Sequence, residues 1–132
     1  MGERGRPVQR ILRLEGGSYT IEGIVAIGVF FILVMLIVQI GFLILARGVA
    51  ATTVEAALRR AVVSNVDVDA VRAGLERDVM AVVPGAESLA VDVSEDPEAL
   101  RAVVRFRWLP PGPDFLPITV TVERVIVRVV PP

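Results

Sequence analysis

The sequence predicts an α+β protein with a long apolar N-terminal helix, a second, amphipathic helix and a three-stranded antiparallel sheet. Three observations lead to this class. Residues 23–46 are apolar except for Gln39, hydrophobic residues then recur at steps of three and four up to about residue 83, and three runs of alternating apolar residues follow. A chain of 132 residues leaves room for only one small domain after the apolar segment.

Residues 23–46 form a segment that is long enough to cross a lipid bilayer. At ~1.5 Å per residue, about 24 helical residues span roughly 36 Å, which exceeds a hydrocarbon core of ~30 Å. The apolar part of a secretory signal peptide is shorter, roughly 7–15 residues, so we expect this segment to remain as an anchor. Residues 1–17 are expected to be a loosely structured leader that carries arginines: Arg4, Arg6, Arg10 and Arg13.

The first helix is expected to cover residues 18–64, because small apolar residues continue at helical spacing beyond the anchor. Glu55 and Arg59 lie one turn apart on its polar side and are expected to pair. Asp67 is in the right place to cap a second helix at residues 68–83, whose apolar side is formed by Val68, Val71, Leu75, Val79 and Val82.

Pro84-Gly85 ends the second helix, and three extended runs follow at residues 88–93, 102–109 and 118–130. Their order and short connections predict an antiparallel meander. Near Glu123-Arg124 the alternation changes parity, which predicts either a bulge or a strand with apolar residues on both faces. The residues expected to face the helices are Leu89, Val91, Val93, Val104, Phe106, Trp108, Ile118, Val120 and Val122.

The composition excludes many kinds of chemistry. The chain has no cysteine and no histidine, so it cannot form thiolate nucleophiles, histidine-based triads or the common zinc sites. Its net charge of −1 comes from +1 over residues 1–46 and −2 over the remainder, so no concentrated basic surface for nucleic acid is expected. We expect neither enzymatic activity nor a cofactor.

Two groups in the domain at residues 65–132 have a simple structural explanation. Phe106, Trp108 and Phe115 could form a binding patch, but aromatic residues on an alternating strand belong more often to the core. The acidic residues in and after the first extended run lack the glycine-bearing spacing of a calcium loop and are expected to be solvated: Asp92, Glu95, Asp96 and Glu98. The edge of the last strand could pair with a neighbouring chain.

The most informative segment for function is residues 16–22, which reads GGSYTIE and directly precedes the apolar run. A glutamate stands five residues after a glycine. Glu22 could simply be the last polar group before the bilayer, favoured by the positive end of the helix dipole, with Ser18 or Thr20 as the N-cap.

The segment also resembles the processing site of type IV pilin-like proteins, in which a basic leader ends in glycine and a glutamate is fifth in the mature chain. In particular, residues 13–63 are similar to the TadE/TadF-like minor pilins, or pseudopilins, of tight-adherence pilus systems. The features that carry the likeness are Gly17, Glu22, Gln39-Ile40-Gly41, Arg47 and the run Ala56-Ala57-Leu58-Arg59-Arg60-Ala61. The chain departs from many members by having Gly23 after the glutamate and then Gly28.

The resemblance implies a pilin-like fold and a precursor that a membrane prepilin peptidase cuts between Gly17 and Ser18 on the cytoplasmic side. It implies that Glu22 then neutralises the new amine of Ser18 on its own chain or on a neighbouring subunit. The partners would be the peptidase, other pilin or pseudopilin subunits, platform proteins of the pilus and the lipid bilayer. The chain would cross the inner membrane once, with its N-terminus cytoplasmic and its domain extracytoplasmic.

Gln39, Gly41 and Gly48 are the further candidates for assembly. A polar residue within the membrane tends to find a partner on another helix, and glycines seven residues apart share a face that allows close packing. Arg47 is more simply an interfacial anchor that reaches the lipid headgroups. The alternative function is an uncleaved, single-pass anchor whose outer domain binds a partner or scaffolds a complex of the cell envelope.

Overall fold

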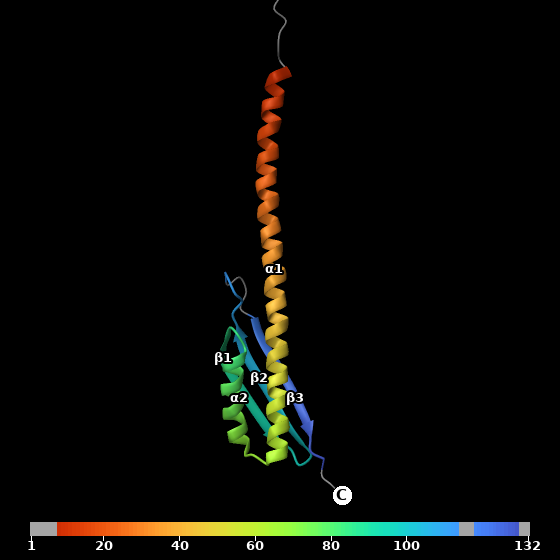
Figure 1. Cartoon of the computed structure of the whole chain (residues 1–132), viewed down its shortest axis with the longest axis vertical. Helices are drawn as coiled ribbons and strands as arrows, with labels where there is room; N and C mark the ends of the chain where they lie inside the picture. Colours follow the sequence, from red (N-terminus) through yellow and green to blue (C-terminus); the bar gives the residue numbers. More distant parts are fainter. Residues whose placement is uncertain (1–7, 114–117, 130–132) are drawn as a thin grey trace, which may run out of the picture. The chain divides into compact units, whose positions relative to one another are not determined.

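The computed structural model describes the backbone of residues 8–113 and 118–129 and the side chains of residues 19–113 and 118–129. Its elements confirm the α+β class: helix α1 (Val8–Ser64), helix α2 (Val68–Val82) and strands β1 (Ala86–Glu95), β2 (Ala99–Trp108) and β3 (Ile118–Val127) (Figure 1). The chain forms two compact units, Met1–Val38 and Gln39–Pro132, and the second unit holds the sheet, α2 and the end of α1.

Helix α1 begins earlier than expected. The leader at residues 1–17 was expected to be loosely structured, with Gly16-Gly17 outside the helix, yet the helix starts at Val8 and runs through both glycines. A helical glycine is less favourable than alanine by only about 1 kcal/mol, and Ile11, Leu12 and Leu14 are compatible with a helix. The two glycines therefore weaken this stretch without stopping it.

The end of α1 at Ser64 confirms the expected boundary. Asn65 adopts a left-handed conformation with a φ of 48°, and the amide of Val66 donates a hydrogen bond to the carbonyl of Ala61 at 3.3 Å. This pairing is the Schellman arrangement, which closes the last turn of a helix and redirects the chain. Helix α2 can then start only a few residues later.

Helix α2 lies close to its expected bounds. Asp67 occupies the N-cap position with extended backbone angles, but its side chain makes no capping hydrogen bond, so only the position was predicted correctly. The buried residues of α2 are Val71, Leu75 and Val79, one turn apart, as the apolar spacing predicts. Packing of this stripe, rather than the cap, is what stabilises the helix.

The sheet is the expected antiparallel meander, with the strand order β1-β2-β3. The pairing of β2 with β3 is unbroken from Ala99 opposite Val127 to Trp108 opposite Ile118, so the bulge considered near residue 123 is absent. The register shift lies instead in β1, between Glu87 and Ala90, where Ser88 has a φ of 51°. The alternative with apolar residues on both faces of the last strand is therefore the correct one.

Arg124 explains the change of parity in β3. It lies opposite Ala102 on the face of the sheet that the helices cover, where the alternation calls for an apolar residue, yet it is exposed. This is possible because β3 is an edge strand. Val125 and Val127 lie on the opposite face and are exposed by 49% and 66%.

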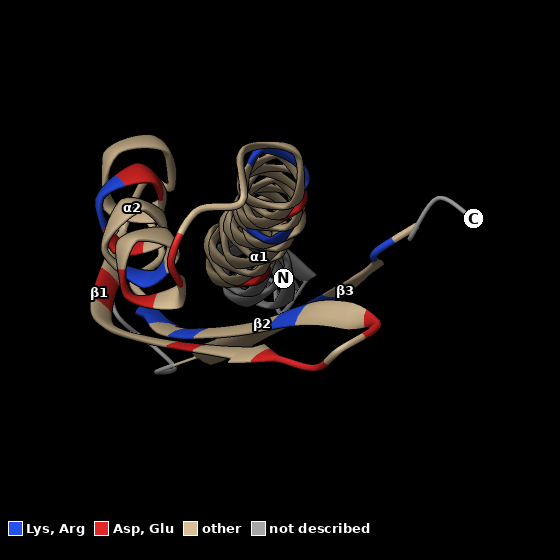
Figure 2. Ribbon diagram, turned by 90° about the horizontal axis from the view of Figure 1, so that it is seen from below, with Lys and Arg blue, Asp and Glu red and all other residues tan. Residues whose placement is uncertain are grey.

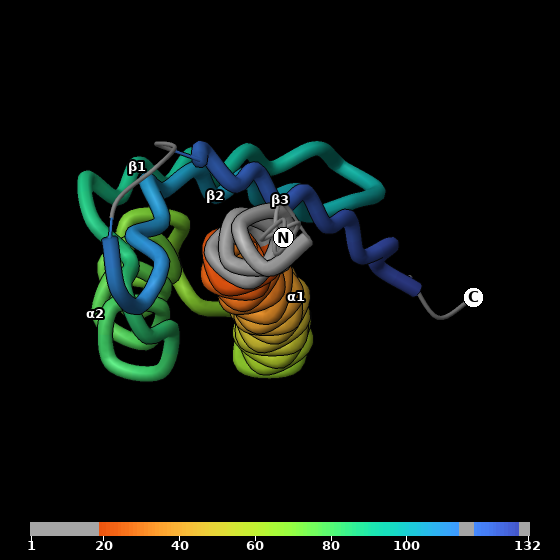
Figure 3. Tube along the Cα trace, turned by 90° about the horizontal axis from the view of Figure 1, so that it is seen from above, coloured from red at the N-terminus to blue at the C-terminus, as the bar shows by residue number. Residues whose placement is uncertain are grey.

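The C-terminal part of α1 and helix α2 lie on the same face of the sheet (Figures 2 and 3). The core between these layers is entirely apolar in the described part of the chain. Phe106 and Trp108 are only 1% and 2% exposed, which confirms that they are core residues, while Phe115 lies outside the described residues. Helix α1 contributes Ala46, Ala50, Val54, Leu58 and Ala61. These mostly small side chains let the helix approach the sheet closely.

Gly85 is required where α2 leads into β1. Its φ is +79°, its carbonyl accepts a hydrogen bond from the amide of Leu109 at 2.9 Å, and an added Cβ would lie 2.5 Å from the carbonyl oxygen of Leu109. The chain has no room to relax there, because Leu109 directly follows the buried Trp108.

We therefore expect Gly85→Ala to lower the free energy of unfolding by about 2 kcal/mol or more, from the left-handed backbone and the clash together. Chemical denaturation of the full chain in detergent micelles measures this. Gly74→Ala is the matched control, since Gly74 is helical with nothing within 4 Å of the added atom, and it should raise stability by up to about 1 kcal/mol. Equal effects of the two substitutions would contradict the argument.

Candidate processing and assembly site on helix α1

The apolar segment of α1 has no polar side. Within Tyr19–Ser64 the helix is long and apolar enough to cross a membrane, by length and composition. Large hydrophobic side chains are exposed in every direction from Tyr19 to Val34, for example Phe30 at 62%. A helix that is apolar all round needs an apolar environment on all sides, which a bilayer or a bundle of similar helices provides.

Gly17 and Ser18 lie within this helix, ahead of the apolar segment. Glu22 follows Ser18 by one turn, so the backbone of Ser18 and the side chain of Glu22 are on the same side of α1. The Glu22 side chain is exposed, and no ion pair joins it to any residue whose side chain is described. The structure thus brings the predicted processing position and the predicted assembly residue together.

Gln39 lies on the side of α1 that faces the sheet. It precedes Leu43 and Ala46 on one helical stripe, and Leu43 packs against the core in which Ala46 is fully buried. The side chain of Gln39 is half-buried, and its Nε2 is buried without a hydrogen-bond partner. A buried, unsatisfied amide is destabilising by about 1–3 kcal/mol, so we expect Gln39 to lower the stability of the single chain.

Gly41 and Gly48 lie on a different side of α1 from Gln39. They are seven residues apart and share one exposed face, and no atom comes within 4 Å of a Cβ built at either position. One turn beyond Gly48, the Thr52 hydroxyl donates hydrogen bonds to the carbonyls of Gly48 at 3.2 Å and Val49 at 3.0 Å. The hydroxyl group of Thr52 is thus hydrogen-bonded within its own helix.

The predicted assembly residues therefore divide into two sets. Glu22, Gly41 and Gly48 are exposed, and the fold of the single chain does not use their side chains. Gln39 belongs to the side where α1 packs on its own domain. Gly41 lies on a different side of α1 from Gln39 because two residues along a helix turn the side chain by about 200°.

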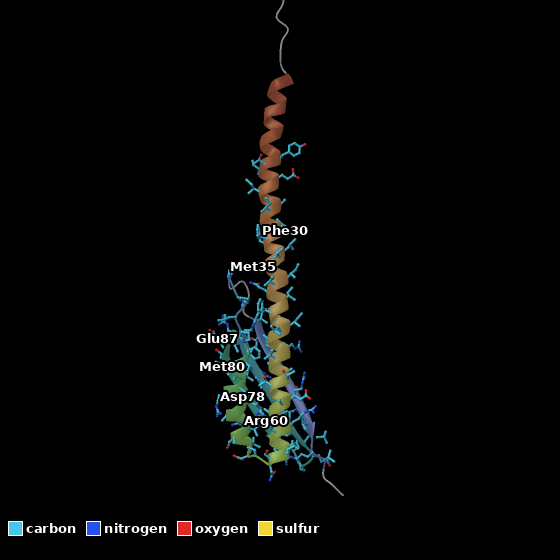
Figure 4. The ribbon with its side chains drawn as sticks, in the orientation of Figure 1. Phe30, Met35, Arg60, Asp78, Met80 and Glu87 are labelled. Carbon is cyan, nitrogen blue, oxygen red and sulfur yellow. The ribbon has the colours of Figure 1, made fainter. Side chains whose placement is uncertain are left out.

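The sequence did not reveal the hollows along both sides of α1. One lies between α1 and α2, has a volume of about 290 Å³ and is lined by Ala57, Ala61 and Gly74 among others. Arg60 and Asp78 flank it and pair at 3.5 Å across the two helices (Figure 4). Two further hollows lie between α1 and β3. Small side chains of α1 leave these spaces unfilled. Their positions depend on how α2 and β3 pack beside α1, which the sequence pattern does not define.

Comparison of the chain with protein-family models, curated proteins and solved structures finds no match. A function can therefore be proposed only from the residues of the chain.

The structure also shows the ion pairs of the domain. Glu55 and Arg59 form the expected ion pair at 2.5 Å, and Glu95 pairs with Arg128 at 2.5 Å. No group of three acidic residues that could hold a metal ion occurs in the described part of the chain.

We expect Gln39→Leu to raise the free energy of unfolding of the isolated chain by about 1 kcal/mol, because leucine fills a similar volume without an unsatisfied amide. Denaturation of the full chain in detergent micelles, followed by the fluorescence of its single tryptophan, tests this. The control is Gln39→Ala, which removes the amide but leaves a cavity and should not stabilise the chain. A loss of stability in Gln39→Leu would show that the amide has a partner.

Proposed function

We propose that this chain is a membrane-anchored subunit of a type IV pilus-like assembly, similar to the TadE/TadF-like minor pilins. One observation carries the proposal: a carboxylate, Glu22, directly precedes the exposed apolar segment of α1 at residues 23–46, five residues after Gly17. An ionised carboxylate at the edge of hydrocarbon is unfavourable by a few kcal/mol unless a positive group accompanies it.

Cleavage between Gly17 and Ser18 by a prepilin peptidase would supply that positive group. The new amine of Ser18 would stand one turn before Glu22 on the same side of the helix, or next to the Glu22 of a neighbouring subunit in register. Cleavage would also remove the leader arginines. Pairing of the two charges in the membrane removes the cost of burying each one alone, which favours subunits stacked in register.

The glycine pair is suited to such cleavage even though it is helical in the uncut chain. Proteases act on an extended backbone, so the helix must open locally around the scissile bond. Two adjacent glycines make that opening easier by about 2 kcal/mol relative to two alanines. The helix therefore has its weakest point where the proposed cut lies.

The exposed face of Gly41 and Gly48 supports assembly through α1. Helices in lipid associate mainly through close packing, and glycines allow two backbones to approach. The single chain makes no contact over either residue that a side chain would disturb. A second subunit could therefore pack against this face at Gly41, whereas at Gly48 the face borders the hollow beside β3.

Mass spectrometry of the mature N-terminus tests the proposal. The chain should begin at Ser18 when it is produced in cells with an active prepilin peptidase, and at Met1 or Gly2 when the peptidase carries an inactivating substitution in its active site. A chain that keeps residues 1–17 in the presence of the active peptidase would contradict the proposal.

The second candidate function is an uncleaved single-pass anchor for a binding or scaffold domain of the cell envelope. One observation favours it: α1 is continuous from Val8, so the glycine pair forms no extended segment in the uncut chain. The same mass measurement separates the two candidates, since the anchor would be intact whether or not the peptidase is active.

A further inference from the structure

A basic hollow lies where α1 leaves its apolar segment. It has a volume of about 630 Å³ and is enclosed by Ile44–Ala51 of α1 on one side and by residues 121–124 of β3 on the other. Arg47 and Arg124 both line it. These two arginines come from positions far apart in the sequence, and the packing of β3 beside α1 places both along one hollow.

Arg124 lines the hollow because of the register of β3. It lies opposite Ala102, on the helix-covered face of the sheet, at the strand next to α1. One guanidinium nitrogen, Nη1, donates a hydrogen bond to the carbonyl of Glu123 at 2.9 Å, which leaves the other donors of the group unused by any bond of the described residues. An arginine in this position has a fixed place and spare donors.

The carboxylates nearby are already paired with other arginines. Glu123 also lines the hollow, but its side chain pairs with Arg101 at 2.6 Å. Glu55, which lies with Arg124 at the adjacent hollow, pairs with Arg59 at 2.5 Å. Within the described residues, neither Arg47 nor Arg124 forms an ion pair. The hollow therefore presents two positive groups that form no ion pair with a carboxylate of the described residues.

The walls and the position of the hollow suit a lipid. Ile44, Gly48 and Ala51 supply an apolar or small surface beside the two arginines. Arg47 directly follows the apolar residues 23–46, so the hollow begins where a bilayer-spanning segment would emerge among the headgroups.

We propose that this hollow binds the phosphate group of an anionic membrane phospholipid, with Arg47 and Arg124 as its ligands. A guanidinium group forms paired, charge-assisted hydrogen bonds with phosphate oxygens, and two such groups from different elements define a site rather than a diffuse attraction. The proposal rests on the membrane anchoring of the proposed function and is independent of cleavage after Gly17. Bound lipid would fix α1 and β3 to the membrane surface together.

The test uses the full chain in lipid nanodiscs and counts the phospholipid molecules that remain bound after mild detergent extraction, by native mass spectrometry. The discs contain phosphatidylcholine with or without phosphatidylglycerol. We expect retention of phosphatidylglycerol over phosphatidylcholine, and a reduction of about tenfold or more for Arg47→Gln or Arg124→Gln. The matched control is Arg105→Gln, which removes the same charge from an exposed position on the other face of the sheet.

Three outcomes would overturn the proposal. Equal retention of the two lipids would show that no anionic site exists, and an equal loss in the Arg105→Gln variant would show that only net charge matters. Displacement of phosphatidylglycerol by millimolar glycerol 3-phosphate would show a site for free phosphate esters instead of lipid. Flotation with phosphatidylcholine vesicles checks the anchoring separately, because a chain that inserts but retains no lipid refutes the lipid site alone, whereas a chain that does not float refutes the anchoring as well.

Discussion

Glu22→Ala is expected to leave the proposed cleavage after Gly17 intact and to reduce incorporation of the subunit into the proposed pilus-like assembly by at least about tenfold. The carboxylate contributes nothing to the fold of the single chain, since it is exposed and forms no ion pair with a described side chain. Its removal would leave the amine of Ser18 alone at the edge of the hydrocarbon. An unpaired charge costs about 2.5–3.5 kcal/mol at the centre of a membrane and less toward its edge, and a loss of only about 1.4 kcal/mol already corresponds to tenfold.

Two variants and two readouts make the Glu22 test specific. The mature N-terminus is measured by mass spectrometry, and incorporation is measured by the amount of subunit that co-purifies with sheared filaments or the assembly complex. Glu22→Asp keeps the charge and should retain part of the incorporation. Glu55→Ala removes an exposed carboxylate of the same helix that is paired only with Arg59, and it should behave as the unmodified chain. Normal incorporation of Glu22→Ala would refute the role of this residue.

Most of the fold could be predicted from the sequence because its pattern is set by local rules. The end of α1 follows from Asn65, a residue that tolerates the left-handed conformation, and the end of α2 from Pro84-Gly85. Phe106 and Trp108 alternate with arginines along β2, so the alternation alone predicts which face of that strand is buried. Each of these features depends on residues within a few positions of one another.

The features that could not be predicted depend on balances between weak effects or on tertiary contacts. The start of α1 at Val8 depends on the summed helix propensities of many residues, which two glycines weaken by about 2 kcal/mol without ending the helix. The bulge in β1 at Ser88 arises from pairing with β2, and no glycine at that position indicates it in the sequence. The alternation in β3 could not show whether Arg124 marks a bulge or an exposed position. A charged residue on the inner face is tolerated here because β3 is an edge strand.

The candidate site shows the same division. The neighbourhood of Ser18 and Glu22 follows from helical spacing, which the sequence contains. The separation of Gln39 from Gly41 and Gly48 follows from the same spacing, but which side of α1 meets the sheet is a tertiary fact. The hollow of Arg47 and Arg124 requires the register of β3 against β2 and its packing beside α1, neither of which is local.

Phe106→Ala is expected to lower the free energy of unfolding by about 3–5 kcal/mol, which is a fifth or more of the stability of a typical domain. Phe106 is 1% exposed and is one of the two largest fully buried side chains. It lies opposite Val120 in the register of β2 and β3, and it belongs to the same apolar cluster as Leu58 of α1 and Leu75 of α2. Its removal therefore leaves a cavity that no single neighbour can fill.

The measurement is chemical denaturation of the full chain in detergent micelles, followed by the fluorescence of Trp108. This is the only tryptophan, it is 2% exposed, and it lies two residues from Phe106 on the same face of β2, so its emission reports solvent entry into this core. Val127→Ala is the matched control, because Val127 is 66% exposed on the uncovered face of β3 and should change stability by less than about 0.5 kcal/mol. Similar losses for Phe106→Ala and Val127→Ala would show that the two faces of the sheet are equally buried in solution, as an assembly closing over β3 would require.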